Sequence, residues 1–254
     1  MPTAGVEFAK VSFTPDGGPS ILRDISLTLA SGTTTALLGR SGSGKTTLLR
    51  TVNGLVQPTS GQVTVHGKRA NELHDVQQQI ALRRGIGYVI QETGLFPHMT
   101  VERNAVMSLE LDGRPKTDLE KRAREVIEQV GLDFDAVRSR FPWQLSGGQR
   151  QRVGLARALA LDPPVMLMDE PFGALDPLTR SEMQEMFKEL QRQKKRTVVL
   201  VTHDLGEALY LADRVIILHN GQVVADLPEG EIASSENPHV KDYVSAVNNL
   251  IERL

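Results

Sequence analysis

The chain has 254 residues, 40% of them hydrophobic and 24% charged, which provides a core for one large domain or two small ones. Its 29 Lys and Arg residues and 31 Asp and Glu residues give a net charge of -2, so the composition shows no general preference for nucleic acid or an anionic membrane surface. The absence of cysteine excludes disulfides, thiolate metal sites and cysteine nucleophiles.

The sequence predicts neither secretion nor a membrane span. The N-terminal residues Met1–Glu7 lack the basic and apolar regions of a signal peptide. The longest apolar runs, such as Val198–Val201, are far short of the ~20 residues that a spanning helix needs. Aromatic residues make up only 4% of the chain, which argues against a stacking surface for single-stranded nucleic acid.

The first third of the chain favours short strands. Residues 6–29 have strand-like stretches on either side of a turn rich in Pro and Gly. The apolar run Thr35–Leu38 stops at a cluster of glycines, and a helix is predicted from Lys45. Residues 63–66 and 85–90 are again typical of strands.

Residues 92–164 favour helices rather than strands. One helix is predicted to be capped by Thr117 and Asp118 and to end at Gly131. Its apolar stripe consists of Leu119, Ala123, Val126, Ile127 and Val130. We interpret residues 92–164 as a helical insertion.

Apolar strands return at residues 165–168, 198–202 and 215–218. Between the first two lies a predicted helix, whose basic end at 194–196 is interpreted as solvated. Its core positions are Met183, Met186, Phe187 and Leu190. Asn220-Gly221 predicts the type I′ turn of a hairpin.

Together these elements predict a single α/β domain over residues 1–254. Its core is expected to comprise residues 1–91 and 165–254, and a helical subdomain is expected at 92–164.

The cluster of glycines is a phosphate-binding pattern. Gly39–Thr46 matches G-x-x-x-x-G-K-[ST], with a predicted strand before it and a predicted helix after it. Glycines let backbone N–H groups turn toward phosphates, and the helix presents the positive end of its dipole. Lys45 is expected to reach the β- and γ-phosphates, and the Thr46 hydroxyl to bind Mg²⁺. The predicted nucleotide-binding residues are Gly39, Ser41, Gly42, Ser43, Gly44, Lys45, Thr46 and Thr47.

Two carboxylates, Asp169 and Glu170, follow an apolar strand. At the carboxyl edge of a parallel sheet they would face a ligand crevice. Asp169 is expected to bind Mg²⁺, and Glu170 to orient and deprotonate the attacking water. Taken alone, such a pair is more often only a polar strand end, and it is the phosphate loop upstream that favours the functional interpretation.

A second glycine motif, Leu145–Gln149, opens another predicted helix. Ser146 is the expected N-cap, and the paired glycines leave backbone N–H groups exposed. The motif predicts a second anion site, although a single triphosphate does not need two cradles from one chain. An ordinary capped helix is the alternative.

These motifs, with Gln91, Ala174-Leu175-Asp176 and His203, occur in the order found in ATP-binding cassette (ABC) ATPases. The chain resembles the nucleotide-binding subunit of an ABC transporter over nearly its whole length. The resemblance implies a P-loop NTPase core of mostly parallel strands with helices, an N-terminal antiparallel β part and an inserted helical subdomain. It also implies ATP and Mg²⁺ as cofactors.

The resemblance further implies a head-to-tail dimer, with ATP between the phosphate loop of one copy and the Ser146 helix of the other. Ser146, Gly147 and Gly148 would bind the γ-phosphate in trans, with Gln149 in the same site. Asp176 would lie at the dimer interface, and His203 would hydrogen-bond the γ-phosphate. Gln91 would contact Mg²⁺ and the attacking water. The implied catalytic residues are Glu170, His203 and Gln91, and the implied metal ligands are Thr46, Gln91 and Asp169.

One position departs from the family pattern. Family members usually have an aromatic residue near the N-terminus that stacks on adenine, and here that position is Pro15. Phe13 is the candidate replacement, with plain core packing as the alternative. The histidines other than His203 show no metal-ligand spacing and are interpreted as surface or turn residues; they are His66, His74, His98, His219 and His239.

A single ATPase unit without a span resembles the ATPase of an importer with separate permease subunits. The resemblance implies a peripheral position on the cytoplasmic face of the cell membrane, a second copy or a similar ATPase as dimer partner, an indirect link to a solute-binding protein, and no nucleic acid. Leu95, Phe96 and Met99 are expected either in the groove that receives a permease helix or in the core. Since the sequence stops at Leu254, no regulatory CBS domains are expected.

The segments 88–101 and 169–176 are most similar to the ATPases of osmoprotectant importers for glycine betaine, choline or carnitine. The alternatives are an importer of amino acids such as methionine or proline, and an ABC ATPase without a transport role.

Overall fold

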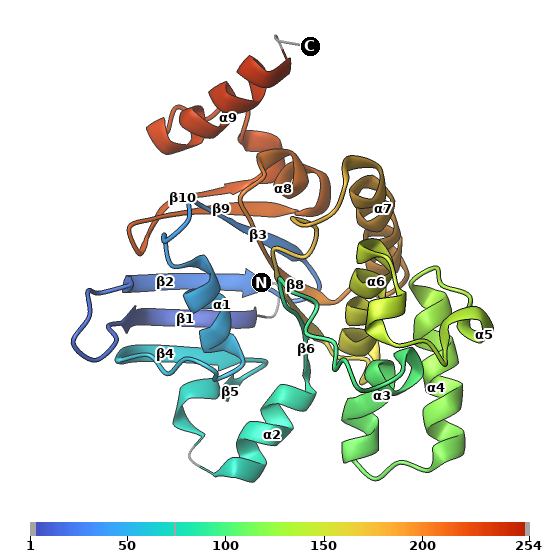
Figure 1. The fold of residues 1–254 in the computed structure, drawn as a ribbon. Helices are drawn as coiled ribbons and strands as arrows, with labels where there is room; N and C mark the ends of the chain where they lie inside the picture. The colour runs from blue at the N-terminus through green and yellow to red at the C-terminus, as the bar shows by residue number, and fades with distance from the viewer. Residues whose placement is uncertain (1–3, 74, 252–254) are drawn as a thin grey trace. The chain divides into compact units, whose positions relative to one another are not determined.

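The computed structural model describes residues 4–73 and 75–251, which form two compact units (Figure 1). The first unit consists of the described residues of Met1–Arg83 and Thr197–Leu254, and the second of Arg84–Arg196. Among the described residues, no helix has the length and hydropathy needed to cross a membrane. The bounds of these two units differ from those of the core and the 92–164 subdomain that the sequence predicts, and that division into subdomains stays a prediction.

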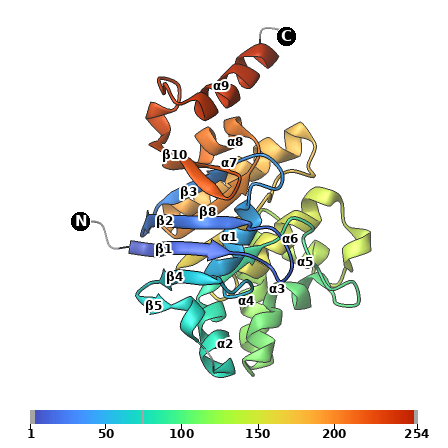
Figure 2. The same cartoon turned by 90° about the vertical axis from the view of Figure 1, so that its left-hand side faces the viewer.

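An antiparallel sheet lies in the first unit (Figure 2). Its strands follow the order β2-β1-β4-β5. Their bounds are Ala4–Phe13 for β1, Leu22–Ala30 for β2, Ser60–Val65 for β4 and Lys68–Arg69 for β5. Val6, Val11 and Leu22 are fully buried, as expected for a sheet with one face on the core. This sheet is the antiparallel β part that the sequence predicts.

The first unit also holds a mostly parallel set of strands in the order β10-β9-β3-β8. Strand β3 (Thr34–Leu38) pairs in parallel with both β8 (Thr197–Thr202) and β9 (Arg214–His219). Strand β10 (Gln222–Pro228) closes an antiparallel hairpin with β9. Asn220 and Gly221 in its turn have φ values of 48° and 77°, as a type I′ turn requires.

Short helices complete the first unit. They are α1 (Lys45–Val52), η1 (Ala70–Glu72), α2 (Val76–Arg84, whose last residue belongs to the second unit), α8 (Leu205–Leu211), η3 (Glu229–Glu231) and α9 (Pro238–Ile251). Helices α8 and α9 share a core with the parallel strands, in which Leu38, Leu205 and Val240 are almost completely buried. This core fixes the end of β3, from which the phosphate loop starts.

The second unit combines two parallel strands with a group of helices. Strand β6 (Ile86–Val89) pairs with β7 (Val165–Asp169). The helices are α3 (Val101–Leu111), α4 (Lys116–Gln129), α5 (Phe134–Val137), η2 (Pro142–Gln144), α6 (Gly147–Leu159) and α7 (Pro177–Gln193). The helices from α3 to α6 lie between β6 and β7, in agreement with the helical character predicted for residues 92–164, and α7 follows β7.

Two local predictions are wrong. Helix α4 begins at Lys116 after Pro115, so Thr117 and Asp118 lie inside its first turn and do not cap it. Proline fixes its own φ near the helical value and lacks an N–H, which suits a helix start and moves it ahead of the polar pair. Arg196 is not solvated but only 5% exposed, because its guanidinium pairs with Asp162 at 3.0 Å.

Candidate functional site

The phosphate loop connects β3 to α1 and turns on left-handed glycines. Gly42 and Gly44 have φ values of 78° and 101°, which residues other than glycine rarely adopt. Helix α1 therefore starts directly after Gly44. The Lys45 ammonium is buried and donates to the carbonyl oxygens of Gly39 at 2.7 Å and Arg40 at 3.1 Å. The backbone of the phosphate loop thus surrounds the positively charged Lys45 ammonium.

The residues of this loop fit a phosphate chain. The Ser43 Oγ is buried and has no hydrogen-bond partner among the described residues, so it is available to a ligand. A Cβ on Gly39 would lie 2.5 Å from both Ser43 Oγ and the Leu218 oxygen, so glycine alone fits there. A buried cation, an unpaired hydroxyl and a helix N-terminus are the donors that phosphates require. Of the other hydroxyls of the predicted set, Ser41 is exposed in the loop, and Thr46 and Thr47 are half-buried at the start of α1.

The first unit also holds Phe13 and His203. Phe13 is half-buried at the end of β1, where it pairs with Leu22, so its role toward adenine stays a prediction. His203 directly follows β8 and is exposed. The chain turns there because Asp204 N donates to Thr202 Oγ1 at 3.0 Å, after which Asp204 caps α8. His203 is therefore presented by a local turn at the carboxyl end of a buried strand.

The second unit brings Gln91 and Glu170 together. Asp169 ends strand β7 and is 3% exposed, and Glu170 follows it with a φ of 46°. A glutamate in the left-handed region is uncommon and carries strain. The Gln91 amide Nε2 donates to Glu170 Oε2 at 3.2 Å. The sequence predicts both residues as catalytic, and the structure places them in direct contact.

The Leu145–Gln149 motif forms a capping box at the start of α6. Ser146 Oγ accepts from Gln149 N at 3.2 Å, and Gln149 Oε1 accepts from Ser146 N at 3.0 Å. Ser146 and Gly147 are exposed, and a Cβ on Gly147 would meet nothing within 4 Å. A Cβ on Gly148 would instead lie 2.6 Å from Thr179 Cγ2. The helix start is therefore open to an anion on the side of Ser146 and Gly147.

Asp176 caps helix α7. Its Oδ1 accepts from Thr179 N at 3.0 Å, and hydrogen bonding from Thr179 lowers the pKa of the Asp176 carboxyl. The side chain is exposed. A surface carboxylate held ionised in this way suits the predicted interface position, which stays a prediction.

Arg157 of helix α6, which the sequence analysis missed, binds the loop of residues 92–94, called the Gln91 loop. Arg157 Nη2 donates to the Thr93 oxygen and Nη1 to the Gly94 oxygen, both at 2.7 Å. Burial lowers the pKa of Arg157. Thr93 and Gly94 have positive φ values of 44° and 55°, so the guanidinium holds a strained turn. Nothing in the sequence pattern pairs residues 63 and 64 positions apart.

For the ATP hydrolysis that the sequence predicts, we expect Arg157→Gln to lower kcat by up to ~100-fold, because a misplaced Gln91 loop would misalign the attacking water. Steady-state kinetics checks this. Arg152→Gln is the control: Arg152 also lies on α6 and donates to a carbonyl, that of Val130 at 2.9 Å, but no such bond joins it to the Gln91 loop. Equal rate losses in the two variants, matched by equal losses of thermal stability, would assign Arg157 to folding alone.

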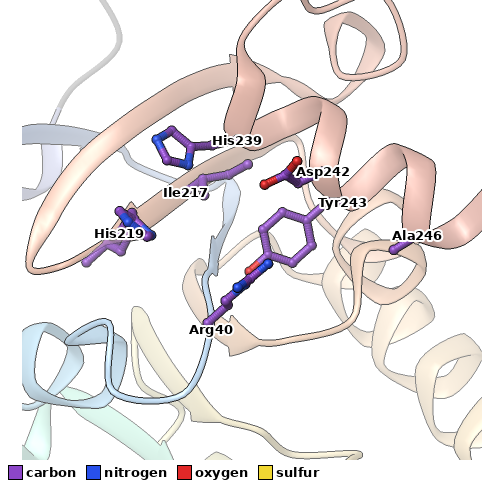
Figure 3. Close-up of a pocket in the computed structure, with 8 residues that line it drawn as sticks. Arg40, Ile217, His219, His239, Asp242, Tyr243 and Ala246 are labelled. Atoms are coloured by element: carbon purple, nitrogen blue, oxygen red, sulfur yellow. The ribbon is translucent and has the colours of Figure 1, made fainter.

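A pocket of about 270 Å³ lies beside the phosphate loop in the first unit (Figure 3). It is lined by Arg40, by Ile217, Leu218 and His219 of β9, and by His239, Asp242, Tyr243 and Ala246 of α9. His219 and His239, predicted as surface or turn residues, are half-buried with ring centroids 4.7 Å apart. Burial raises the pKa of the Tyr243 hydroxyl, while the charge of Arg40 opposes the shift.

Of the remaining histidines, His66 lies in the turn after β4 with a φ of 45°, and His98 is exposed. His74 lies outside the described residues.

Within the described ranges, no group of three or more His, Cys, Asp or Glu side chains could hold a metal ion. Asp169 is the one carboxylate among the predicted metal ligands, which suits Mg²⁺ because this ion usually binds through substrate phosphates and one or two carboxylates.

Leu95, Phe96 and Met99 are half-buried. Asn104 fixes their loop, since its Oδ1 accepts from Phe96 N at 2.8 Å and its Nδ2 donates to three loop carbonyls.

Comparison with known proteins places these motifs in one family. A family model described as "ABC transporter" matches residues 22–173. The glycine betaine/carnitine/choline transport ATP-binding protein OpuCA of Bacillus subtilis is 42% identical over 240 residues, which is 94% of this chain and 62% of that protein. The sulfate/thiosulfate import ATP-binding protein CysA of Mycobacterium tuberculosis is 44% identical over 230 residues, 90% of this chain and 63% of that protein. The chain thus spans about three fifths of the length of both relatives.

A solved structure agrees. The dimer of the ATP-binding cassette MJ0796 in a post-hydrolysis state, bound to ADP and phosphate, matches with a TM-score of 0.80 at 33% identity. The match covers 88% of this chain and 98% of that chain. The predicted P-loop NTPase fold and the predicted family are therefore confirmed.

Proposed function

The chain belongs to the ABC transporter family, and from this premise we propose that it hydrolyses ATP to power import through separate membrane subunits. The observation that carries the proposal is the pair of preformed elements, a phosphate loop with a buried lysine and a Gln91–Glu170 contact at the end of β7. We propose osmoprotectants such as glycine betaine, choline or carnitine as cargo, because the name of one relative gives these solutes.

In the proposed reaction the phosphate loop holds ATP. Lys45 and the backbone N–H groups of Gly42 to Thr46 neutralise the phosphates. Thr46, Asp169 and Gln91 would hold Mg²⁺, which when bound draws charge from the phosphate oxygens. Glu170 takes the proton of the attacking water, Gln91 holds that water and Glu170 in register, and His203 donates to the γ-phosphate.

A second copy, or a similar ATPase, completes the proposed site. The N-terminus of α6, where Ser146 and Gly147 are exposed and Gly148 follows, would bind the γ-phosphate of an ATP held by the other copy. The dimer would then be two-fold symmetric, with Asp176 at its interface. Support comes from the dimeric cassette structure bound to ADP and phosphate, which is similar to this chain. The permease subunits would place the dimer on the cytoplasmic face of the membrane.

The importer proposal is tested by expressing the chain with a tag and isolating membrane proteins bound to it. Copurified permease subunits that raise ATP hydrolysis when cargo and its binding protein are added would support it. A chain that hydrolyses ATP alone and retains no membrane subunit would favour an ABC ATPase without transport. Glycine betaine, sulfate and methionine, supplied separately, discriminate among cargoes.

We expect Ser146→Arg to leave ATP binding by one chain nearly intact and to reduce hydrolysis to background. The bulky side chain would stand on the face that accepts the γ-phosphate of the other copy and prevent closure. Calorimetric ATP binding and phosphate release check the two halves. Ser234→Arg, at an exposed position in the first unit, is the control. Normal hydrolysis by Ser146→Arg would contradict the head-to-tail dimer.

A further inference from the structure

The only tryptophan of the chain lies on the surface, directly before the Ser146 helix. Trp143 belongs to η2 and is 64% exposed. Its ring stacks on Phe141 with 4.6 Å between centroids and 7° between planes. The phenyl ring covers one face of the indole, and the high exposure leaves the other face accessible. Tryptophan is enriched at binding interfaces, so an exposed indole that is held by a stacked ring on its other face is a candidate contact for a ligand or partner.

The short η2 turn holds this aromatic pair in place. Phe141 N donates to Gln144 Oε1 at 2.8 Å, and Gln144 N donates to the Phe141 oxygen at 2.9 Å. Pro142 between them is buried and fixes the backbone at the start of the turn. The exposed indole is therefore positioned before any ligand arrives, which lowers the entropy lost on binding.

Trp143 lies a short way along the chain from the Ser146 helix. Gln144 belongs to η2, in which Leu145 N donates to the Pro142 oxygen at 3.2 Å, and Leu145 is extended, with φ and ψ of -107° and 148°. Trp143 and Ser146 are therefore closer than the about 10 Å that three fully extended residues would span. A γ-phosphate bound at the start of α6 would leave the rest of the same nucleotide within reach of the indole.

Neither position considered for adenine stacking in the first unit presents an exposed aromatic ring. The family position for adenine stacking is Pro15, and Phe13 is half-buried within the pairing of β1 and β2. We propose that Trp143 binds the adenine of the ATP carried by the second copy. Residues 143–148, called the Ser146 segment, would then contact both the adenine and the γ-phosphate of that nucleotide. The inference rests on the proposed head-to-tail dimer. The site is incomplete without the partner copy, and its ligand is a purine nucleoside triphosphate.

Kinetics of substitution variants tests the base contact. Base–aromatic stacking of this kind corresponds to roughly 5- to 100-fold in affinity. We expect Trp143→Ala to raise KM for ATP by that factor with little change in kcat, and Trp143→Phe to restore most of the loss. ATP binding by the isolated monomer should not change in either variant. Leu111→Ala, which removes another exposed apolar side chain of the second unit, 75% exposed, is the control.

A wild-type KM for ATP in Trp143→Ala would overturn the inference. It would also be overturned if ATP binding by the isolated monomer weakened by the same factor as KM rises. A variant that changes only transport with the permease subunits would assign the indole to a membrane partner instead.

Fluorescence of the only tryptophan gives a second readout. In a Glu170→Gln background, Mg-ATP should quench Trp143 emission as dimers form, and Mg-CTP should quench it less because a pyrimidine stacks over a smaller area. A Ser146→Arg chain should show no quenching. Absence of the dimer would count against the proposed function. A dimer with unchanged emission and equal responses to ATP and CTP would count against the base contact alone.

Discussion

Lys45→Ala should reduce the affinity for ATP by at least ~100-fold, because it removes a cation from the curve of the phosphate loop, and hydrogen bonds to charged groups each contribute about 1.5–3 kcal/mol. The Lys45 ammonium is 6% exposed and is held by two loop carbonyls, so its position is set before binding. Isothermal titration calorimetry with Mg-ATP measures the loss directly.

Two further variants keep this result interpretable. Removing a buried ammonium also leaves the carbonyls of Gly39 and Arg40 without their donor, so Lys45→Ala could lose stability as well as affinity. Lys45→Met keeps the apolar stem and should lose ATP binding to the same extent. Lys68→Ala, at an exposed lysine of β5, should bind normally. Tight ATP binding by a folded Lys45→Met chain would show that this loop is not the nucleotide site.

The phosphate loop was predictable because its function dictates its local sequence. Two left-handed glycines, a lysine and a threonine must follow a buried strand at fixed spacing, and here they do. The capping box of Ser146 and Gln149 is equally local, since both partners lie within one turn. The antiparallel strands before the phosphate loop were predictable from the short-range alternation of apolar residues, and the Asn220-Gly221 turn from its turn residues.

Contacts between residues distant in the sequence could not be predicted in this way. The clamp of Arg157 on the Gln91 loop, the ring contact of His219 with His239 and the burial of Arg196 against Asp162 all depend on tertiary packing. An arginine or a histidine carries no local signal that distinguishes a solvated side chain from a buried one. The error at the start of α4 is different, because Pro115 and Thr117 both start helices well and only the structure decides between them.

Helix α6 connects the position where the γ-phosphate of the other copy would bind to the two loops beside Glu170 and Gln91. Its N-terminus carries Ser146, its middle donates from Gln151 to the Pro171 oxygen next to Glu170, and its later turns carry Arg157 against the Gln91 loop. A helix with internal hydrogen bonds moves as a unit, so a displacement of its first turn is transmitted to both loops. We therefore expect variants of Arg157 and Ser146 to be non-additive in hydrolysis.

Glu170→Gln should lower the turnover of ATP by ~10²–10⁴-fold, the contribution typical of a general base. Glutamine keeps the shape of the side chain and an oxygen that can accept from Gln91 Nε2, but it cannot take a proton from water. Lys45, Thr46 and the Ser146 segment are untouched, so ATP should still bind. With hydrolysis nearly stopped, the variant should accumulate as an ATP-bound dimer, because bound ligand stabilises the state that holds it.

Light scattering with Mg-ATP shows the dimer as roughly twice the mass of one chain, at protein concentrations above the dimer dissociation constant. Glu92→Gln, which neutralises an exposed acid next to Gln91, should hydrolyse ATP at the normal rate. Wild-type turnover in Glu170→Gln would mean that another group activates the water. Loss of ATP binding would mean that Glu170 holds the metal or the loop after β7, where its φ of 46° already requires support from its surroundings.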